Sequence, residues 1–245
     1  MNKSSVEIKK IGYLKTHKCA STSVQNILLR YAQRHNLNVV VPMVAGNIFG
    51  YDKLFNRKFI QTLAWKKDPI SYSMFLCHAR WNHTEVSFVL NDTGKSDVFY
   101  FSFLRDPVEL FCSYWDYNGF QREFGALTEF ISKNISKALK SNKSYIWTHG
   151  GYNQMLYDFG LQYNDMNDTK KVKLKIKEIH KNFDLLLLAD QEFFEDSLIL
   201  LKNSIHWDYN DMINFKLNAR SVYDKSKITR EDRKILKGKE LKTMN

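Results

Sequence analysis

The sequence predicts an α/β fold in which helices flank a central, mainly parallel sheet. Short apolar segments typical of strands alternate with longer segments whose apolar residues recur at helical spacing. The run 97–104 (DVFYFSFL) is almost continuously apolar, as expected of a strand buried on both faces of a parallel sheet. Because 245 residues, 44% of them hydrophobic, are enough for one substantial core, we expect a single domain spanning 1–245.

The expected strands are the apolar or β-branched segments 8–14, 38–42, 72–79, 97–104 and 183–189. Helices are expected after Ser23 and over 108–117, 127–139, 152–159, 170–182 and 192–205, with a basic helical tail from about 222 to 245. The small hydroxyl residues before the first helix are expected to cap it, and Pro107 suits a first helical turn. Ligands of parallel sheets bind at the carboxyl ends of strands, where the loops 15–23 and 105–113 begin.

The chain carries a net charge of +11 and has a pI near 9.4, so it should attract anions such as nucleic acid, a membrane surface, an acidic glycan or an anionic cofactor. The basic residues gather in the predicted helices at 170–177 and in the tail. They do not alternate with aromatic residues on strands, and no RNA-binding signature occurs. We therefore expect no nucleic-acid partner, although a nucleic-acid-binding module remains the rival from another functional class.

Three cysteines, Cys19, Cys77 and Cys112, are too few for a disulfide framework and are expected to be buried free thiols. No apolar run reaches the length of a membrane-spanning helix, and the charged start MNKSSVEIKK is not a signal peptide. The chain as given therefore predicts a soluble protein without a transmembrane segment.

The loop 15–23 (KTHKCASTS) places two lysines and four hydroxyl residues between a predicted strand and a predicted helix. Backbone N–H groups and the helix dipole make such a helix start an anion site. The nucleoside-triphosphate pattern GxxxxGK[ST] is absent, and no metal-holding aspartate is evident, which disfavours a P-loop kinase or hydrolase. The plain alternative is an ordinary capped helix with surface lysines.

A second pattern is Arg105-Asp106-Pro107 at a predicted strand end, with Ser113 eight residues further on. An arginine fork suits a phosphate monoester, and Ser113 could supply a hydroxyl to the same group. The alternative is a capping salt bridge at a helix start. The following aromatic run, which includes Trp115, is expected to pack in the core and not against a nucleotide base.

Residues 14–28 (LKTHKCASTSVQNIL) resemble the 5′-phosphosulfate loop of the galactose 3-O-sulfotransferase family and, more distantly, that of the heparan sulfate 2-O-sulfotransferases. Segments 153–161, 183–190 and 214–221 resemble the first family in the same order. The resemblance implies a P-loop-type sulfotransferase fold. It also implies metal-free transfer of a sulfuryl group from 3′-phosphoadenosine 5′-phosphosulfate (PAPS) to a hydroxyl, with the 3-OH of galactose in a glycolipid or glycan as the expected acceptor.

The resemblance assigns roles to particular residues. Lys18 matches the catalytic lysine on the oxygen that bridges phosphate and sulfate, and Arg105 with Ser113 matches the pair that binds the 3′-phosphate. The donor-binding loop would comprise Lys15, Thr16, His17, Lys18, Cys19, Ala20, Ser21, Thr22 and Ser23, with Cys19 in place of the threonine expected there.

The general base is expected to be His78, because His78-Ala-Arg-Trp-Asn resembles the catalytic-histidine segment of both families and a histidine titrates near neutrality. His17 is the rival base, or a hydrogen-bond donor to the sulfate. Arg80 would hold an acidic part of the acceptor or orient His78.

The expected function is thus a PAPS-dependent sulfotransferase. The alternatives are a catalytically altered nucleotide- or glycan-binding relative and a sulfotransferase for a non-sugar small molecule; the presence of both Lys18 and His78 favours an enzyme. The resemblance implies the Golgi lumen. Family members begin with a membrane anchor that is missing here, so a soluble cytoplasmic form or a trimmed chain is the other expectation.

Overall fold

The computed structural model describes residues 7–43, 46–60, 71–94, 97–134, 153–215 and 228–240. The chain divides into two compact units. The first comprises Met1–Leu104, Asp158–Gly160 and Glu178–Leu217, and the second comprises Arg105–Tyr157, Leu161–Lys177 and Asn218–Asn245. The expectation of one domain stays a prediction.

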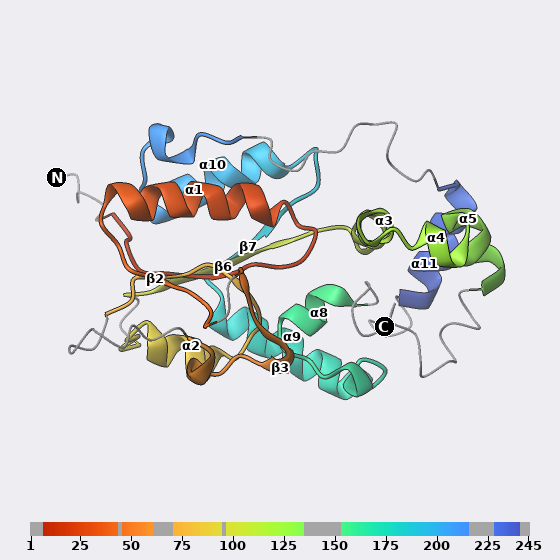
Figure 1. The fold of residues 1–245 in the computed structure, drawn as a ribbon, viewed down its shortest axis with the longest axis horizontal. Coiled ribbons are helices and arrows are strands. Elements are labelled where there is room, and N and C mark those ends of the chain that lie inside the picture. The colour runs from red at the N-terminus through yellow and green to blue at the C-terminus, as the bar shows by residue number, and fades with distance from the viewer. Residues whose placement is uncertain are drawn as a thin grey trace. The chain divides into compact units, whose positions relative to one another are not determined.

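A five-stranded parallel sheet forms the centre of the first unit, in the order β2-β4-β1-β6-β7, which confirms the α/β class (Figure 1). The strands are β1 (Ile11–Leu14), β2 (Val39–Val40), β4 (Met74–Phe75), β6 (Phe99–Leu104) and β7 (Leu185–Leu188). β1 is fully buried between β4 and β6, and its register with β6 pairs Leu14 with Ser102. The apolar run of β6 is therefore an inner strand, as predicted, whereas the leucine run of β7 is an edge strand with Leu188 44% exposed.

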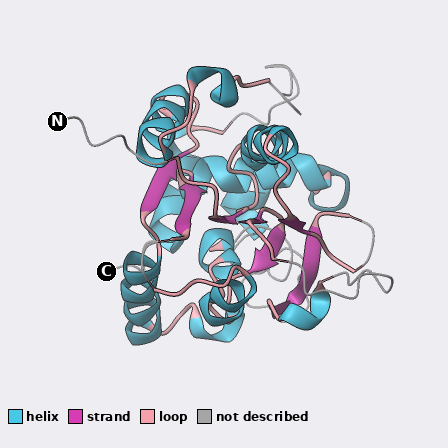
Figure 2. Ribbon diagram, turned by 90° about the vertical axis from the view of Figure 1, so that its left-hand side faces the viewer, coloured by secondary structure: helices cyan, strands magenta, loops and turns pink. Residues whose placement is uncertain are grey.

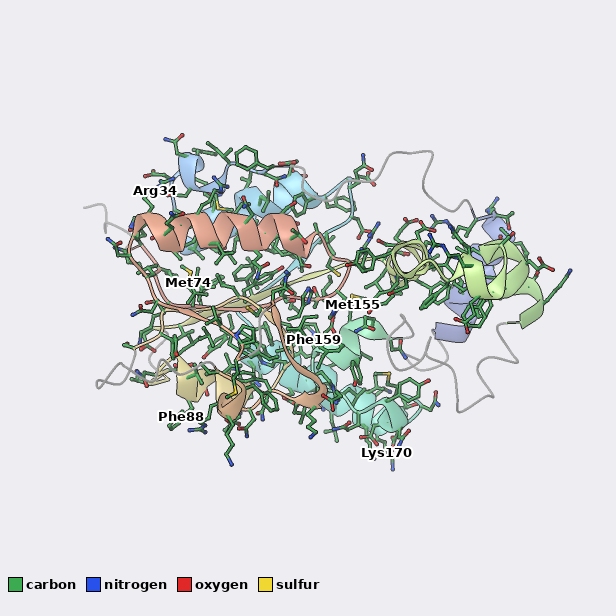
Figure 3. The ribbon with its side chains drawn as sticks, in the orientation of Figure 1. Arg34, Met74, Phe88, Met155, Phe159 and Lys170 are labelled. Carbon is green, nitrogen blue, oxygen red and sulfur yellow. The ribbon has the colours of Figure 1, made fainter. Side chains whose placement is uncertain are left out.

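Helices cover both faces of this sheet (Figures 1 and 2). α1 (Ser21–Arg34) and α10 (Phe194–Ile205) lie over one face, and α2 (His83–Val89) lies on the other. The buried residues of α1 recur at helical spacing, including Val24, Ile27, Leu28 and Tyr31. Figure 3 shows Met74 of β4 on the α1 side of the sheet and Phe88 of α2 far from it, at an exposed position.

The predicted strand 72–79 is in fact two strands. β4 ends at Phe75, and β5 (His78–Arg80) begins a separate parallel pair with β3 (Ile48–Leu54). Just past the end of β4, the carbonyl of Leu76 accepts the side-chain amide of Gln25 at 3.0 Å. His78 therefore opens a strand instead of ending one. β3 itself was not predicted, because most of its residues are exposed and show no apolar alternation.

The second unit is helical. It contains α3 (Pro107–Asn118), α4 (Gln121–Phe124), α5 (Leu127–Glu129) with a π-helical turn over Phe130–Asn134, and α11 (Arg230–Glu240). Trp115 is 0% exposed and packs against the rings of Phe120, Phe124 and Phe130, so core packing explains it. The predicted helix 127–139 is described only to residue 134, and the predicted tail helix only over 230–240.

Two helices, α8 (Gln154–Asp158) and α9 (Thr169–Asn182), contribute residues to both units. Three short 3₁₀ turns cover Arg57–Phe59, Tyr163–Asp165 and Tyr209–Met212. The three cysteines are buried and free, as expected. Across the described ranges, no helix is both long enough and apolar enough to cross a membrane.

Candidate functional site

The loop that follows β1 lies where the strand order changes direction. From β1 the chain continues to β2 and β4 on one side and later to β6 and β7 on the other, and ligands of such sheets bind at this kind of point. Two buried hydrogen bonds fix the loop to β6. The hydroxyl of Thr16 donates to the carbonyl of Phe103 at 2.6 Å, and that of Ser102 donates to the carbonyl of Leu14 at 2.9 Å. The start of the loop is therefore rigidly placed.

The loop contains two left-handed residues although it has no glycine. Lys18 has φ 58° and Ala20 has φ 51°, a conformation that costs a non-glycine residue about 1–2 kcal/mol. Backbone strain of this kind is typical of ligand-binding and catalytic loops. Lys18, the candidate catalytic lysine, is itself one of the strained residues.

The start of α1 has no side-chain cap. Its N-cap residue is Ala20, which corrects the expectation that hydroxyl residues cap the helix. The hydroxyl of Ser23 donates instead to the carbonyl of Phe215 at 3.2 Å. The first-turn N–H groups, which include those of Ser21 and Thr22, thus form the uncapped helix start that suits an anion.

Lys15 is buried with a neutral partner. Lys15 is 1% exposed, and its Nζ donates to Oε1 of Gln25 at 2.6 Å. Within the described part of the chain, no carboxylate pairs with this ammonium group. Burial therefore lowers the pKa of Lys15 to about 8, with Cys77 opposing the shift. An anionic ligand would supply the missing countercharge.

His17 and His78 lie together beside this lysine. Their rings stack with centroids 4.0 Å apart and planes 24° apart. Nδ1 of His78 lies 2.7 Å from the carbonyl oxygen of Lys15. Because a carbonyl can only accept, Nδ1 must carry the proton, which makes Nε2 the basic nitrogen of a neutral ring. Burial first, and then the nearby charges of His17, Lys15 and Lys18, hold the pKa of His78 well below its ordinary value.

His17 has an acidic partner. Nδ1 of its ring lies 3.1 Å from Oδ1 of Asp158, and its backbone N–H donates to Oδ2 at 2.8 Å. The hydroxyl of Tyr51 donates to Asp158 as well and lies 3.1 Å from the same Nδ1. Asp158 is 0% exposed, and burial raises the pKa of its carboxyl while His17 opposes the rise. Neither Asp158 nor Tyr51 was among the residues singled out in the sequence.

The other candidate residues of the first unit are placed as follows. The thiol of Cys19 donates to the carbonyl of His17 at 3.3 Å, so it faces the loop backbone, whereas the hydroxyl of Thr16 faces β6. Arg80 is 2% exposed and donates to the carbonyl of Asp52 at 3.2 Å. Its role in holding an acidic part of the acceptor or in orienting His78 stays a prediction. No cluster of His, Cys, Asp or Glu in the described ranges could hold a metal ion.

The second candidate pattern belongs to the second unit. Asp106 accepts from the backbone N–H groups of Val108 and Glu109, so it caps α3, and Pro107 occupies the first turn. Nη2 of Arg105 lies 3.9 Å from Glu109, a long contact between partly exposed groups. Ser113 is 9% exposed, two turns into α3. The capping alternative therefore describes Asp106, while the ion pair of Arg105 with Glu109 is weak.

Comparison with known proteins shows a match along nearly the whole chain. A family model described as galactose-3-O-sulfotransferase matches residues 2–239. Galactose-3-O-sulfotransferase 2 of Mus musculus is 32% identical over 234 residues, covering 91% of this chain and 56% of the relative. Galactosylceramide sulfotransferase of Homo sapiens is 31% identical over 222 residues, covering 86% and 49%. The chain spans about half the length of the curated relatives it matches.

Proposed function

The chain belongs to the galactose-3-O-sulfotransferase family, and from that premise we propose that it transfers a sulfuryl group from PAPS to the 3-OH of galactose in a glycolipid or glycan. The observation that carries the proposal is the stacked pair His17 and His78 beside the buried Lys15, at the carboxyl end of β1. The names of the relatives, which specify galactose and galactosylceramide, support the acceptor class.

In this proposal the loop after β1 binds the phosphosulfate. Lys15 gains an anionic partner, and the uncapped first turn of α1, with Ser21 and Thr22, donates hydrogen bonds to the anionic oxygens. Lys18 neutralises the charge that grows on the leaving phosphate oxygen. The acceptor oxygen attacks sulfur, the bond from sulfur to the phosphate oxygen breaks, and adenosine 3′,5′-bisphosphate leaves. Positioning and charge stabilisation lower the barrier, as they do in phosphoryl transfer.

The acceptor proton passes to Nε2 of His78. A neutral ring whose Nδ1 donates to the carbonyl of Lys15 can only accept through Nε2, which is what a general base requires. In this scheme His17, whose Nδ1 is held by Asp158, is the hydrogen-bond donor to the sulfuryl oxygens. The reversed assignment, with His17 as the base, is separated by the single variants described below.

Arg105 and Ser113 hold the 3′-phosphate of the donor in this scheme. The support is the family resemblance of the pair, together with the position of Ser113 two turns into α3, the helix that begins two residues after Arg105. The Golgi lumen is the proposed compartment, on the same family resemblance.

The test is incubation with PAPS labelled with ³⁵S and a panel of galactosylceramide, a β-galactoside, the matching 3-deoxygalactoside, a steroid and a phenol. We expect label on the galactosides, none on the 3-deoxy compound, and none with Lys18→Ala. Label on the steroid or phenol would replace the acceptor class. Tight binding of adenosine 3′,5′-bisphosphate without any transfer would establish a binding relative instead of an enzyme.

A further inference from the structure

We propose that Asp158, assisted by Tyr51, is a positioning residue that fixes the protonation and orientation of His17 in the donor loop. The inference rests on the proposed sulfuryl transfer and adds to it two residues outside the loop and outside the candidate base segment. Asp158 lies 141 positions from His17 along the chain, and Tyr51 comes from β3. The juxtaposition is therefore a product of the fold.

The carboxylate of Asp158 holds both the backbone and the ring of His17. Oδ2 accepts the backbone N–H at 2.8 Å, and Oδ1 lies 3.1 Å from Nδ1. Tyr51 donates its hydroxyl to the same carboxylate and contacts the same ring nitrogen. With Nδ1 held in this way, the chemistry of the ring must pass through Nε2. The carboxylate also fixes the backbone one residue before the strained Lys18.

Asp158 is itself held by the backbone around it. Its carbonyl accepts the N–H of Trp81 at 2.7 Å. At Gly160, with φ +94°, a Cβ would lie 2.3 Å from the carbonyl oxygen of Trp81, so only glycine permits this approach. Phe159, labelled in Figure 3, is buried against Phe183. Because Trp81 directly follows β5, which begins at His78, one short strand connects the anchor of Asp158 to His78.

Charge supports the same role. A buried carboxylate is costly unless it is paired, and His17 is an ionisable group that pairs with Asp158. Among the groups that face His17 are Asp158, Tyr51 and the ring of His78, with Lys15 and Lys18 near His78. Burial, followed by the charges of His17, Lys15 and Lys18, holds the pKa of His78 below its ordinary value, while the Asp158 carboxylate holds the ring of His17. The two stacked rings thus have different hydrogen-bond partners, as a donor and a base require.

The experiment compares Asp158→Asn with Asp211→Asn. Asp211 is a matched control, because it is also a buried aspartate of the first unit and is paired with a cation, Arg34. The asparagine at 158 can still accept from the backbone N–H of His17, but it removes the charge and can donate to Nδ1, which reverses the tautomer. We expect the KM for PAPS to rise about as much as in His17→Ala and kcat to fall no further than in that variant, with little change in affinity for adenosine 3′,5′-bisphosphate, which lacks the sulfuryl group that His17 contacts. Asp211→Asn should lower thermal stability and leave kcat near wild type.

A second measurement does not depend on activity. ¹⁵N NMR of the imidazoles, with the His17 signals assigned by His17→Gln, should show a protonated Nδ1 in the wild type and a changed tautomer and titration in Asp158→Asn. Tyr51→Phe should shift the same signals in a chain that keeps the carboxylate. The proposal is overturned if the His17 signals and the pH–rate profile are the same with and without the Asp158 carboxylate. It is also overturned if stability and nucleotide affinity fall in parallel with kcat.

The two hypotheses fail separately in this design. A wild-type chain that transfers no sulfuryl group would refute the proposed function, while the His17 titration would still decide the role of Asp158. Should Asp158→Asn fail to fold, the wild-type tautomer and the Tyr51→Phe shift give the answer: Nδ1 unprotonated in the wild type, or signals unmoved by Tyr51→Phe, would overturn the inference.

Discussion

Binding of the donor nucleotide should weaken as the pH rises through about 8, because Lys15 loses its proton there. Burial lowers the pKa of this lysine to about 8 from an ordinary value near 10.4. Because a change of one in pKa corresponds to about 1.4 kcal/mol, the charged form of Lys15 is disfavoured by roughly 3 kcal/mol in the free protein. A bound phosphate restores the charged form, and binding must therefore take up a proton above pH 8.

The sign follows from this linkage. Below pH 8 Lys15 is charged with or without ligand, and affinity is independent of its titration. Above pH 8 the dissociation constant of adenosine 3′,5′-bisphosphate should rise by up to tenfold per pH unit until about pH 10. The ligand itself does not confound the measurement, because its phosphates complete their ionisation near pH 6. Stability of the free protein should rise over the same interval, since the unfolded chain keeps the proton longer.

Isothermal titration calorimetry from pH 6.5 to 9.5, in buffers of different ionisation enthalpy, measures both affinity and proton uptake. We expect uptake approaching one proton per ligand above pH 8 in the wild type and none in Lys15→Met. The matched control is Lys58→Met, which changes an exposed lysine of the same unit and should behave as wild type. A dissociation constant that stays flat from pH 7 to 9.5 would refute the reasoning.

Three further predictions concern the other parts of the site. Turnover should rise with pH below the ordinary histidine range, because the pKa of His78 is lowered by burial and by its charged neighbours. In His78→Ala this pH dependence should vanish and kcat should fall ~10²–10⁴-fold, while His17→Ala should mainly weaken donor binding. The opposite pattern would make His17 the base. Ala20→Gly should leave the free energy of unfolding unchanged or raise it by up to about 1 kcal/mol, because glycine relieves the left-handed strain. The control Ala32→Gly, inside α1, should lower it by about 1 kcal/mol in the same thermal unfolding experiment. Equal losses in the two variants would contradict the strain at Ala20. Arg105→Ala should weaken donor binding by roughly 2–4 kcal/mol, with partial rescue by Arg105→Lys and no effect of the exposed Arg122→Ala, and wild-type affinity would exclude Arg105 from the 3′-phosphate site.

The inner strands of the central sheet could be predicted from the sequence because they are apolar and largely buried. An apolar run such as that of β6 needs no knowledge of its neighbours to be recognised. The β3–β5 pair could not be found in this way, because β3 is largely exposed and β5 is three residues long. Its existence depends on the break of the chain after Phe75, and the continuous apolar run 72–79 gives no sign of that break.

The residues of the candidate site likewise fall into those that the sequence predicts and those that only the tertiary fold brings together. The loop residues could be predicted because they are contiguous, so that one short segment of the sequence shows all of their charged and hydroxyl groups. Asp158 carries no such signal: it lies in a predicted helix between Tyr157 and Phe159, and its burial against His17 arises only from the tertiary fold. The prediction that hydroxyl residues cap α1 was wrong for a similar reason. The hydroxyl of Ser23 is engaged by Phe215, which is distant in sequence, and Ala20 takes the cap position.

The absence of glycine from the loop after β1 has a thermodynamic consequence. A phosphate loop rich in glycine can sample many backbone states before its ligand arrives, and ordering them reduces the affinity. Here Lys18 and Ala20 hold left-handed angles with side chains attached, and the loop is hydrogen-bonded to β6 at its start. The free-energy cost of ordering the loop backbone is thus incurred during folding. The loop is preorganised for the anion, so binding of the nucleotide should proceed with only a small loss of backbone entropy.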